Sequence, residues 1–175
     1  MFRKATLALA ALVAMVFIVP ISASAASPYC GITWGSLEKS AASTQTAELT
    51  DIRAGQHDCY DRLVFDFRGN VNGYRVGYVD QVTEDPTGNP VPLRGGARLA
   101  VTVRAPANDS AGNPTYTFTN RAELVNVTGF QTFRQVAWAG SFEGYTSVGL
   151  GVRARLPFRV FTLPGRIVVD VAHFW

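Results

Sequence analysis

The sequence contains few of the residues that build metal centres. Its 175 residues include only two histidines, His57 and His173, and only two cysteines. A structural zinc site needs four such ligands close together, and a catalytic one needs three. The two histidines are too few and too isolated to build such a site alone. We predict no metal ion and no other cofactor.

Basic residues are neither in large excess nor clustered. The chain has 16 basic and 13 acidic residues, and Arg3 and Lys4 belong to a leader described below. Without them, 14 basic and 13 acidic residues leave a net charge of +1. The remaining arginines are scattered and form no stripe that could follow a phosphate backbone. We therefore predict that nucleic acid is not a partner.

Long hydrophobic runs are absent except at the start of the chain. Arg3 and Lys4 precede an apolar run over residues 5–19, which is followed by small residues ending at Ala25. This is the pattern of a secretory signal peptide, residues 1–25. The run is short for an uncleaved membrane anchor. We predict cleavage near Ala25 and a secreted or envelope protein with no transmembrane segment in the mature chain.

The two cysteines form an even pair in a chain marked for export. In an oxidising compartment, Cys30 and Cys59 are expected to form a disulfide, whereas a redox site favours closer spacing. Closing this loop of about 29 residues contributes roughly 3–4 kcal/mol in the chain-entropy model. The bridge would hold the N-terminal segment, residues 26–47, beside the first core strand.

The sequence has no long segment with the 3.6-residue period of an amphipathic helix, and its apolar residues alternate over short stretches instead. Asp61–Phe67 contains the order Arg, Leu, Val, Phe, Asp, which Arg166–Val171 repeats as Arg, Ile, Val, Val, Asp. Alternate side chains of a strand point to opposite faces, so Leu63 and Phe65 lie opposite Arg62. We predict that the two stretches belong to the two halves of a β-sandwich with a shared core.

Short alternating stretches recur along the chain between Gly, Pro and Asn turn residues. Residues 69–73 and Glu143-Gly144 predict hairpin turns, and residues 36–47 predict a loop or frayed helical turn. We predict an all-β fold, an antiparallel two-sheet β-sandwich over residues 48–175, with a barrel as the alternative. The predicted strands are Glu48–Arg53, Tyr60–Arg68, Tyr74–Val82, Val91–Leu93, Ala97–Ala105, Tyr116–Thr119, Leu124–Phe130, Phe133–Phe142, Tyr145–Val152, Phe158–Leu163 and Arg166–Val171.

The polar residues of the repeated strands are the first candidate ligand-binding group. Arg62, Asp66, Arg166 and Asp170 share the side of their strands that faces away from the core. They could form a polar face that recognises a ligand. The alternative is cross-strand ion pairing on a solvated face, worth about 0.2–1 kcal/mol per pair.

A second candidate group follows the turn at residues 69–73. Tyr74 and Tyr78, with Arg75 nearby, could stack on sugar rings, since aromatic faces suit apolar sugar surfaces. Packing in the core or at a sheet edge is the alternative. Gly149 and Gly151 allow close approach, either by a glycan or by another part of the sheet.

No stretch defines a catalytic site. Gly31–Gly35 has the spacing of a nucleophile elbow with Thr in place of Ser, but it lacks the preceding strand and the following helix. Asp61, Glu84 and Asp85 are carboxylates of the kind that hydrolases use, yet no spacing selects a pair. We predict that the protein is not an enzyme.

Several of these stretches together resemble a known family. The repeated Arg-Leu/Ile-Val-x-Asp strands, Tyr60–Val64 after Cys59, and Gly73–Val79 are similar to secreted actinobacterial proteins described as AMIN-like. The resemblance covers the chain from Cys30 to Trp175. It implies a distant relative of the AMIN domain, a two-sheet β-sandwich that binds the cell wall as a non-catalytic module in peptidoglycan amidases and secretins. No amidase domain follows in this sequence, so we expect wall binding without an attached enzyme.

Three functions are consistent with the sequence. The first is a module that binds a cell-envelope component, namely peptidoglycan or another cell-wall glycan. The second is a carrier of a small apolar ligand, in which Phe65, Phe67 and Leu99 would line a barrel cavity. The third is an envelope protein that docks a protein partner through its long hairpins around Pro86 and Asn108.

Overall fold

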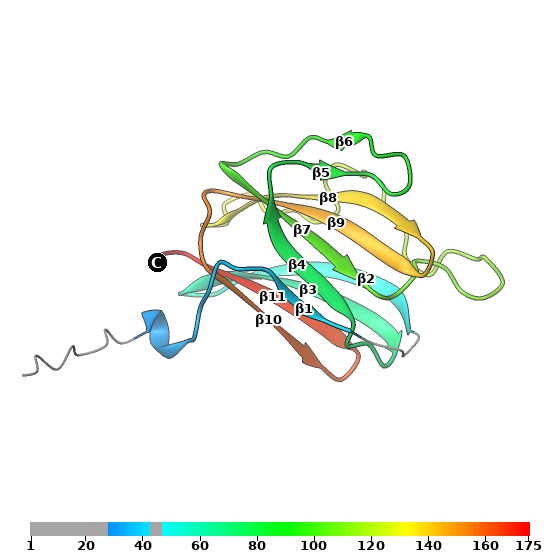
Figure 1. Cartoon of the computed structure of the whole chain (residues 1–175), viewed down its shortest axis with the longest axis horizontal. Helices are drawn as coiled ribbons and strands as arrows, with labels where there is room; N and C mark the ends of the chain where they lie inside the picture. The colour runs from blue at the N-terminus through cyan, green and yellow to red at the C-terminus, as the bar shows by residue number, and fades with distance from the viewer. Residues whose placement is uncertain (1–27, 43–46) are drawn as a thin grey trace, which may run out of the picture.

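The computed structural model describes residues 28–42 and 47–175. They fold into two antiparallel β-sheets, with two short strands above them (Figure 1). The predicted all-β sandwich is confirmed. Neither sheet closes into a barrel, so the barrel alternative is wrong. The predicted signal peptide lies outside the described residues, and no described helix is long and apolar enough to cross a membrane.

The two sheets are named here by their number of strands. The five-stranded sheet has the spatial order β1 (Lys39–Ala41), β4 (Tyr74–Val79), β7 (Ala97–Val103), β9 (Tyr145–Val152) and β8 (Phe133–Phe142). The four-stranded sheet has the order β10 (Phe158–Leu163), β11 (Arg166–Ala172), β3 (Tyr60–Gly69) and β2 (Ala47–Gln56). The remaining elements are a short 3₁₀ turn, η1 (Tyr29–Gly31), and a pair of two-residue strands, β5 (Val82–Thr83) and β6 (Pro90–Val91).

Alternate residues of both sheets fill the space between them. Phe65, Phe67 and Leu99, which would line a cavity in a barrel, are 0, 8 and 0% exposed in one continuous core. Burying a side chain of this size is worth about 1.5–3 kcal/mol. These residues therefore stabilise the sandwich and do not enclose a ligand. Their neighbours in the core include Leu63, Val76, Val101, Val136, Leu150, Phe133, Phe158, Ile167 and Val169.

The two repeated strands do not lie in opposite halves of the sandwich, as the sequence had predicted. β3 and β11 are adjacent and antiparallel in the four-stranded sheet. The alternating pattern specifies only that one side of each strand faces a core, which is true in either sheet. The prediction failed because it assumed that two strands with the same sequence pattern occupy corresponding positions in the two sheets. The two strands instead pair with each other in one sheet.

The turn at residues 69–73 was also assigned the wrong role. It joins β3 of one sheet to β4 of the other and is not a hairpin. Gly69 has φ 101°, which permits the change of direction, and Val71 is buried in the core at 5% exposure. Turn residues indicate where the chain changes direction, but they do not show whether the strands on either side of the turn pair with each other.

Several other predictions were met and some were not. The hairpin at Glu143-Gly144 joins β8 to β9, and β10 has the predicted bounds. Residues 116–119 and 124–130 contain no strand. They belong to a long connection that bonds to the edge of β8, where the Leu124 amide donates to the Val136 carbonyl at 2.8 Å. Conversely, β1 forms within the predicted loop as a three-residue edge strand.

A flap covers part of the outer side of the five-stranded sheet. It contains β5 and β6, which lie above β8 and β9 in Figure 1, and Val82, Val91 and Leu93 pack there against alanines of the sheet. A Cβ built on Gly149 would lie 2.8 Å from Leu93 Cδ1, and one on Gly151 would lie 2.1 Å from the Arg94 carbonyl oxygen. The two glycines therefore allow the flap to pack closely on the sheet. This agrees with the alternative that they serve close packing by the protein itself and not the approach of a glycan.

The predicted disulfide is present between Cys30 and Cys59, with an S–S distance of 2.01 Å. It joins η1 to the residue that directly precedes β3. Trp34 follows on this tethered segment, and its ring centroid lies 5.9 Å from that of Tyr60. The bridge thereby holds η1 and Trp34 close to the start of β3.

Candidate ligand-binding face

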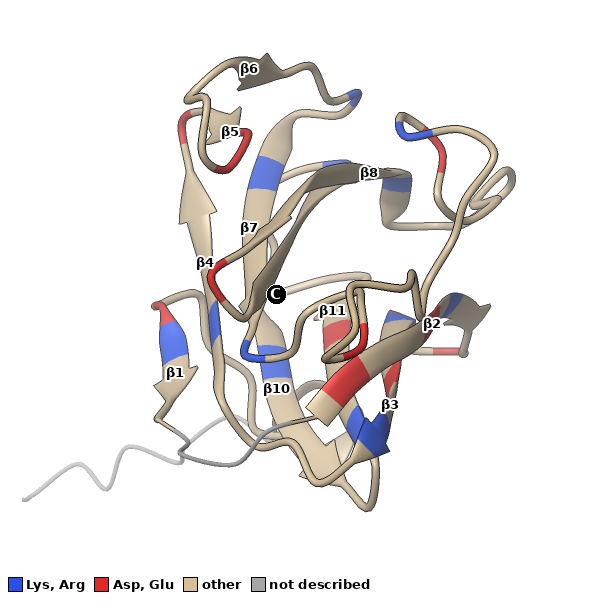
Figure 2. Cartoon of the chain, turned by 90° about the vertical axis from the view of Figure 1, so that its right-hand side faces the viewer, with Lys and Arg blue, Asp and Glu red and all other residues tan. Residues whose placement is uncertain are grey.

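The outer side of the four-stranded sheet is the candidate site. Among the described residues it carries no flap like the one on the other sheet, and its Arg53 and Arg166 side chains are 50% and 49% exposed. Figure 2 shows acidic and basic positions along β3, β10 and β11. We call this surface the Arg–Asp face and define it by Trp34, Arg53, Tyr60, Arg62, Asp66, Arg159, Phe161, Arg166 and Asp170.

The four charged residues predicted from the repeat meet as two reciprocal pairs. The register places Arg62 opposite Asp170 and Arg166 opposite Asp66. Arg62 Nε donates to Asp170 Oδ1 at 2.7 Å, and Arg166 Nε donates to Asp66 Oδ1 at 2.9 Å. Since both strands carry Arg and Asp four residues apart and run in opposite directions, each Arg of one strand reaches the Asp of the other.

Each carboxylate also accepts hydrogen bonds from a second guanidinium that the sequence analysis missed. Arg159, on β10, donates from Nε to Asp170 Oδ2 at 2.8 Å. Arg53, on β2, donates from Nε to Asp66 Oδ2 at 2.6 Å. The alternation within Phe158–Leu163 puts Arg159 on the side of the strand opposite Phe158 and Val160, although no binding role was predicted for it. What the sequence could not supply was the order of strands, which sets β10 and β2 beside the repeated pair.

The two carboxylates differ in burial. The Asp170 side chain is 0% exposed, and the Asp66 side chain is 22% exposed. Burial alone would raise the pKa of Asp66, but hydrogen bonds from Arg53 and Arg166 outweigh it and hold the pKa below its usual value. The hydrogen bond to Asp170 raises the pKa of Arg62. The ion-pairing alternative therefore describes the Asp66 group well, whereas Asp170 is not on a solvated surface.

Three aromatic rings surround the buried Asp170 group. The Arg159 guanidinium carbon lies 5.5 Å from the ring centroid of Trp34, 5.3 Å from that of Tyr60 and 5.1 Å from that of Phe161. The Arg62 guanidinium carbon lies 5.2 Å from the Tyr60 ring centroid. Such cation–π contacts orient the guanidiniums. The rings are each partly exposed, so this end of the face combines flat apolar surfaces with fixed hydrogen-bond donors.

The tyrosine group predicted as a sugar platform lies elsewhere. Tyr74 and Tyr78 occupy the core side of β4 and pack against the core. The Tyr78 hydroxyl donates to the Leu156 carbonyl at 2.6 Å and accepts from the Leu156 amide at 2.9 Å. Burial raises the pKa of Tyr78 to about 12. Arg75 points to the opposite side of β4 and pairs with Glu38 at 2.9 Å. These three residues do not join the Arg–Asp face.

A buried polar cluster lies at the start of β3. Asp61 Oδ2 accepts hydrogen bonds from the Thr132 and Phe133 amides at 2.6 and 2.8 Å. His173 Nδ1 lies 2.9 Å from Thr132 Oγ1, and its Nε2 lies 2.9 Å from the His57 carbonyl oxygen. The Asp61, Thr132 and His173 residues are 0–2% exposed. The cluster joins three segments of the fold and offers no access to a substrate. Among the described residues, no group of three potential ligands is placed to hold a metal ion.

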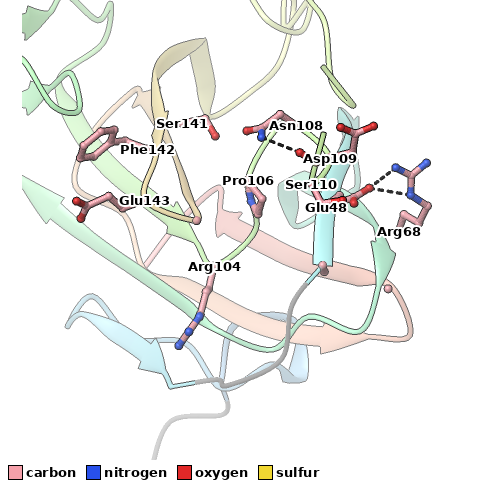
Figure 3. A pocket seen from close by; sticks show the side chains of 13 residues that line it. Glu48, Arg68, Arg104, Pro106, Asn108, Asp109, Ser110, Ser141, Phe142 and Glu143 are labelled. Atoms are coloured by element: carbon pink, nitrogen blue, oxygen red, sulfur yellow. Dashed lines mark hydrogen bonds and ion pairs between the residues drawn. The ribbon is translucent and has the colours of Figure 1, made fainter. Parts of the chain in front are cut away.

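A hollow of about 790 Å³ lies beside the turn between β8 and β9 (Figure 3). Glu48 and Arg68 form an ion pair along its wall. On the turn, Phe142 and Tyr145 are 47% and 43% exposed. The two rings are cross-strand neighbours. This end of the molecule therefore presents an exposed aromatic pair next to a charged depression.

A two-sheet sandwich with one partly covered outer face and one charged, aromatic outer face has the build of a binding module. The comparison with known families agrees with this class: the model of the AMIN-like domain matches residues 47–173. The chain belongs to the AMIN-like domain family, as its sequence had suggested. No curated protein matches the chain. The solved structures contain no match either. Membership of the family associates the chain with cell-envelope targeting and with binding rather than catalysis.

Proposed function

We propose that this protein is a secreted, non-catalytic module that binds peptidoglycan or another cell-wall glycan through the Arg–Asp face. The observation that carries the proposal is the guanidinium and aromatic group around Asp170, on the outer side of the sandwich that no described flap covers. Sugar rings present apolar faces that stack on aromatic side chains, and their hydroxyl groups accept hydrogen bonds from arginine. The leader and the disulfide fit delivery to an oxidising extracytoplasmic compartment.

The placement of the residues changes which aromatic group should make the contact. Tyr78 has both hydrogen bonds of its hydroxyl committed inside the fold, whereas Trp34, Tyr60 and Phe161 belong to the Arg–Asp face. Arg62, Asp66, Arg166 and Asp170, predicted from the repeat, remain in the proposed site. Asp66 and Asp170 accept from the arginines and fix their orientation, and the arginines contact the ligand.

Sedimentation with insoluble peptidoglycan tests the proposal. Mature wild-type protein should bind saturably, and Phe161→Ala should weaken binding because it removes one flat ring from the face. Phe142→Ala is the matched control, since it removes another partly exposed phenylalanine, on the hairpin between β8 and β9 and outside the Arg–Asp face. Equal binding by the two variants and wild type would reject the Arg–Asp face. A folded wild type that stays in the supernatant would reject wall binding itself.

A second candidate function is docking of a protein partner in the envelope. The observation that favours it is the exposed pair of Phe142 and Tyr145 beside the hollow of Figure 3. Exposed aromatic residues are enriched at protein interfaces. Cross-linking of the mature protein on intact cells, with Phe142→Ala beside wild type, tests this candidate. A cross-linked partner that disappears in Phe142→Ala and persists in Phe161→Ala would favour docking at the hairpin.

A further inference from the structure

The two ends of the Arg–Asp face carry different charges. Around Asp66, Arg53 and Arg166 are accompanied by Asp51, which lies opposite Asp66 in the register and interacts electrostatically with Arg53. Two positive and two negative groups balance there. Around Asp170, Arg62 and Arg159 contact one carboxylate. At the aromatic end of the face, the two guanidiniums and one carboxylate therefore leave a net charge of +1.

The hydrogen bonds within the Asp170 group leave donors available. Arg62 and Arg159 both use Nε and Nη2 to reach Asp170, and neither bond set includes Nη1. A guanidinium has five N–H donors in a rigid plane. The Arg62 and Arg159 side chains are 24% and 29% exposed. Each can therefore offer N–H groups of Nη1 to a ligand without releasing the buried carboxylate.

The buried carboxylate holds the two guanidiniums next to each other in spite of their like charge. The aromatic rings add to this restraint, since Phe161 lies 5.4 and 5.1 Å from the guanidinium carbons of Arg62 and Arg159. Arginines held in this way lose little conformational entropy when they bind a ligand. Paired guanidiniums suit planar carboxylates and tetrahedral phosphates, because both accept two parallel hydrogen bonds.

We infer that Arg62 and Arg159 recognise an anionic group, a carboxylate or a phosphodiester, on the cell-wall polymer while Trp34 and Phe161 contact its apolar surface. This inference rests on the proposed function of the same face and specifies its ligand: an acidic wall polymer binds and a neutral glycan does not. Both candidate anions offer the same chemistry, because each presents charged oxygen atoms to the arginine forks.

Chemical treatment of the wall separates the two sources of negative charge. One sample of insoluble wall has its carboxylates converted to amides with a carbodiimide and an amine. A second sample has its phosphodiester-linked polymers removed with hydrofluoric acid, and a third is left untreated. Binding of the wild-type protein to each sample is measured at low and high salt. Loss after amidation identifies carboxylates, loss after acid treatment identifies phosphodiesters, and loss after both shows that either anion contributes.

A variant links the result to the paired arginines. Arg159→Gln leaves the balanced Arg62–Asp170 pair and should weaken binding to untreated wall about tenfold, as expected for one charge-assisted hydrogen bond. It should also reduce the salt dependence. Arg75→Gln is the control, because Arg75 is an ion-paired arginine on the other sheet. The loss of this exposed pair should have little effect on the fold. The affinity of the variant for untreated wall should therefore stay within about twofold of that of wild type.

The outcomes distinguish this inference from the function on which it rests. Equal binding of wild type to all three walls, without salt dependence, would overturn anion recognition and leave wall binding intact. No binding of folded wild type to untreated wall would overturn the proposed function. The wild-type arms decide the question even if Arg159→Gln does not fold.

Discussion

Arg62 and Asp170 lie opposite one another on β3 and β11 and form two hydrogen bonds, at 2.7 and 2.9 Å, across a sequence separation of 108 residues. The Asp170 side chain is fully buried, whereas Arg62 keeps about a quarter of its surface in contact with water. The pair therefore ties the last strand of the chain to an early one and at the same time presents a guanidinium on the outer surface.

The first prediction concerns the loss of this buried carboxylate. Asp170→Asn leaves Arg62 and Arg159 side by side without their shared anion. Removing one partner of a buried ion pair costs about 3–5 kcal/mol of unfolding free energy. Asp66→Asn, in the more exposed group, should cost about 1 kcal/mol or less. Urea unfolding of both variants measures the difference. Equal losses would show that the burial of Asp170 has no energetic consequence.

The sequence predicted the strands well because each strand is specified locally. Phe133–Phe142, Tyr145–Val152 and Phe158–Leu163 were found at their observed bounds from alternation and turn residues alone. The pairing of strands is not local. After the turn at residues 69–73, β4 could join either sheet. The packing of both sheets decides between them, and the residues of the turn do not.

The candidate site was also predictable only where the information is local in the sequence. Arg62, Asp66, Arg166 and Asp170 were found because a repeated sequence is visible without a structure. Arg159 could be placed on the outer side of its strand, but its approach to Asp170 follows from the order of strands across the sheet. For Tyr78 the sequence left ligand binding and core packing open, because alternation states which residues share a side of a strand, and it does not state which side meets the core.

The second prediction concerns the flap on the five-stranded sheet. Gly151→Ala would place a Cβ 2.1 Å from the backbone oxygen of Arg94, which cannot move without moving the flap. Gly149→Ala meets the flexible end of Leu93 at 2.8 Å. Overpacking of this kind costs about 1–3 kcal/mol, so we expect Gly151→Ala to lie at the upper end and Gly149→Ala at the lower. Thermal unfolding compares the two, and a larger loss in Gly149→Ala would contradict the assigned contacts.

The third prediction concerns the bridge between Cys30 and Cys59. Titration of denatured, unreduced protein should find no free thiol. Replacing both cysteines with serine should lower the unfolding free energy by roughly 3–4 kcal/mol, because the unfolded chain regains the freedom of a loop of 29 residues. The segment that carries Trp34 also loses its tether, so tryptophan fluorescence should change before global unfolding. Two reactive thiols in the denatured, unreduced protein would show that the bridge does not form.

The fourth prediction is a pH dependence that arises from Tyr78. Burial raises the pKa of its hydroxyl to about 12 in the folded protein, from an ordinary value of 10.0. Below pH 10 the tyrosine is protonated in both states, and its stabilising contribution is complete. Between about pH 10 and pH 12 the unfolded state loses this proton first, so the contribution falls as pH rises.

Tyr78→Phe tests this dependence because phenylalanine cannot ionise. At neutral pH the variant should be less stable than wild type by about 1 kcal/mol, since the Leu156 amide and carbonyl both lose their hydrogen bonds to the Tyr78 hydroxyl. Above pH 10 the difference between the two proteins should shrink. Tyr116, whose pKa burial also raises to about 12, is present in both proteins and cancels in the comparison. A difference that stays constant from pH 8 to pH 12 in urea unfolding would show that the Tyr78 hydroxyl ionises equally in the folded and unfolded states.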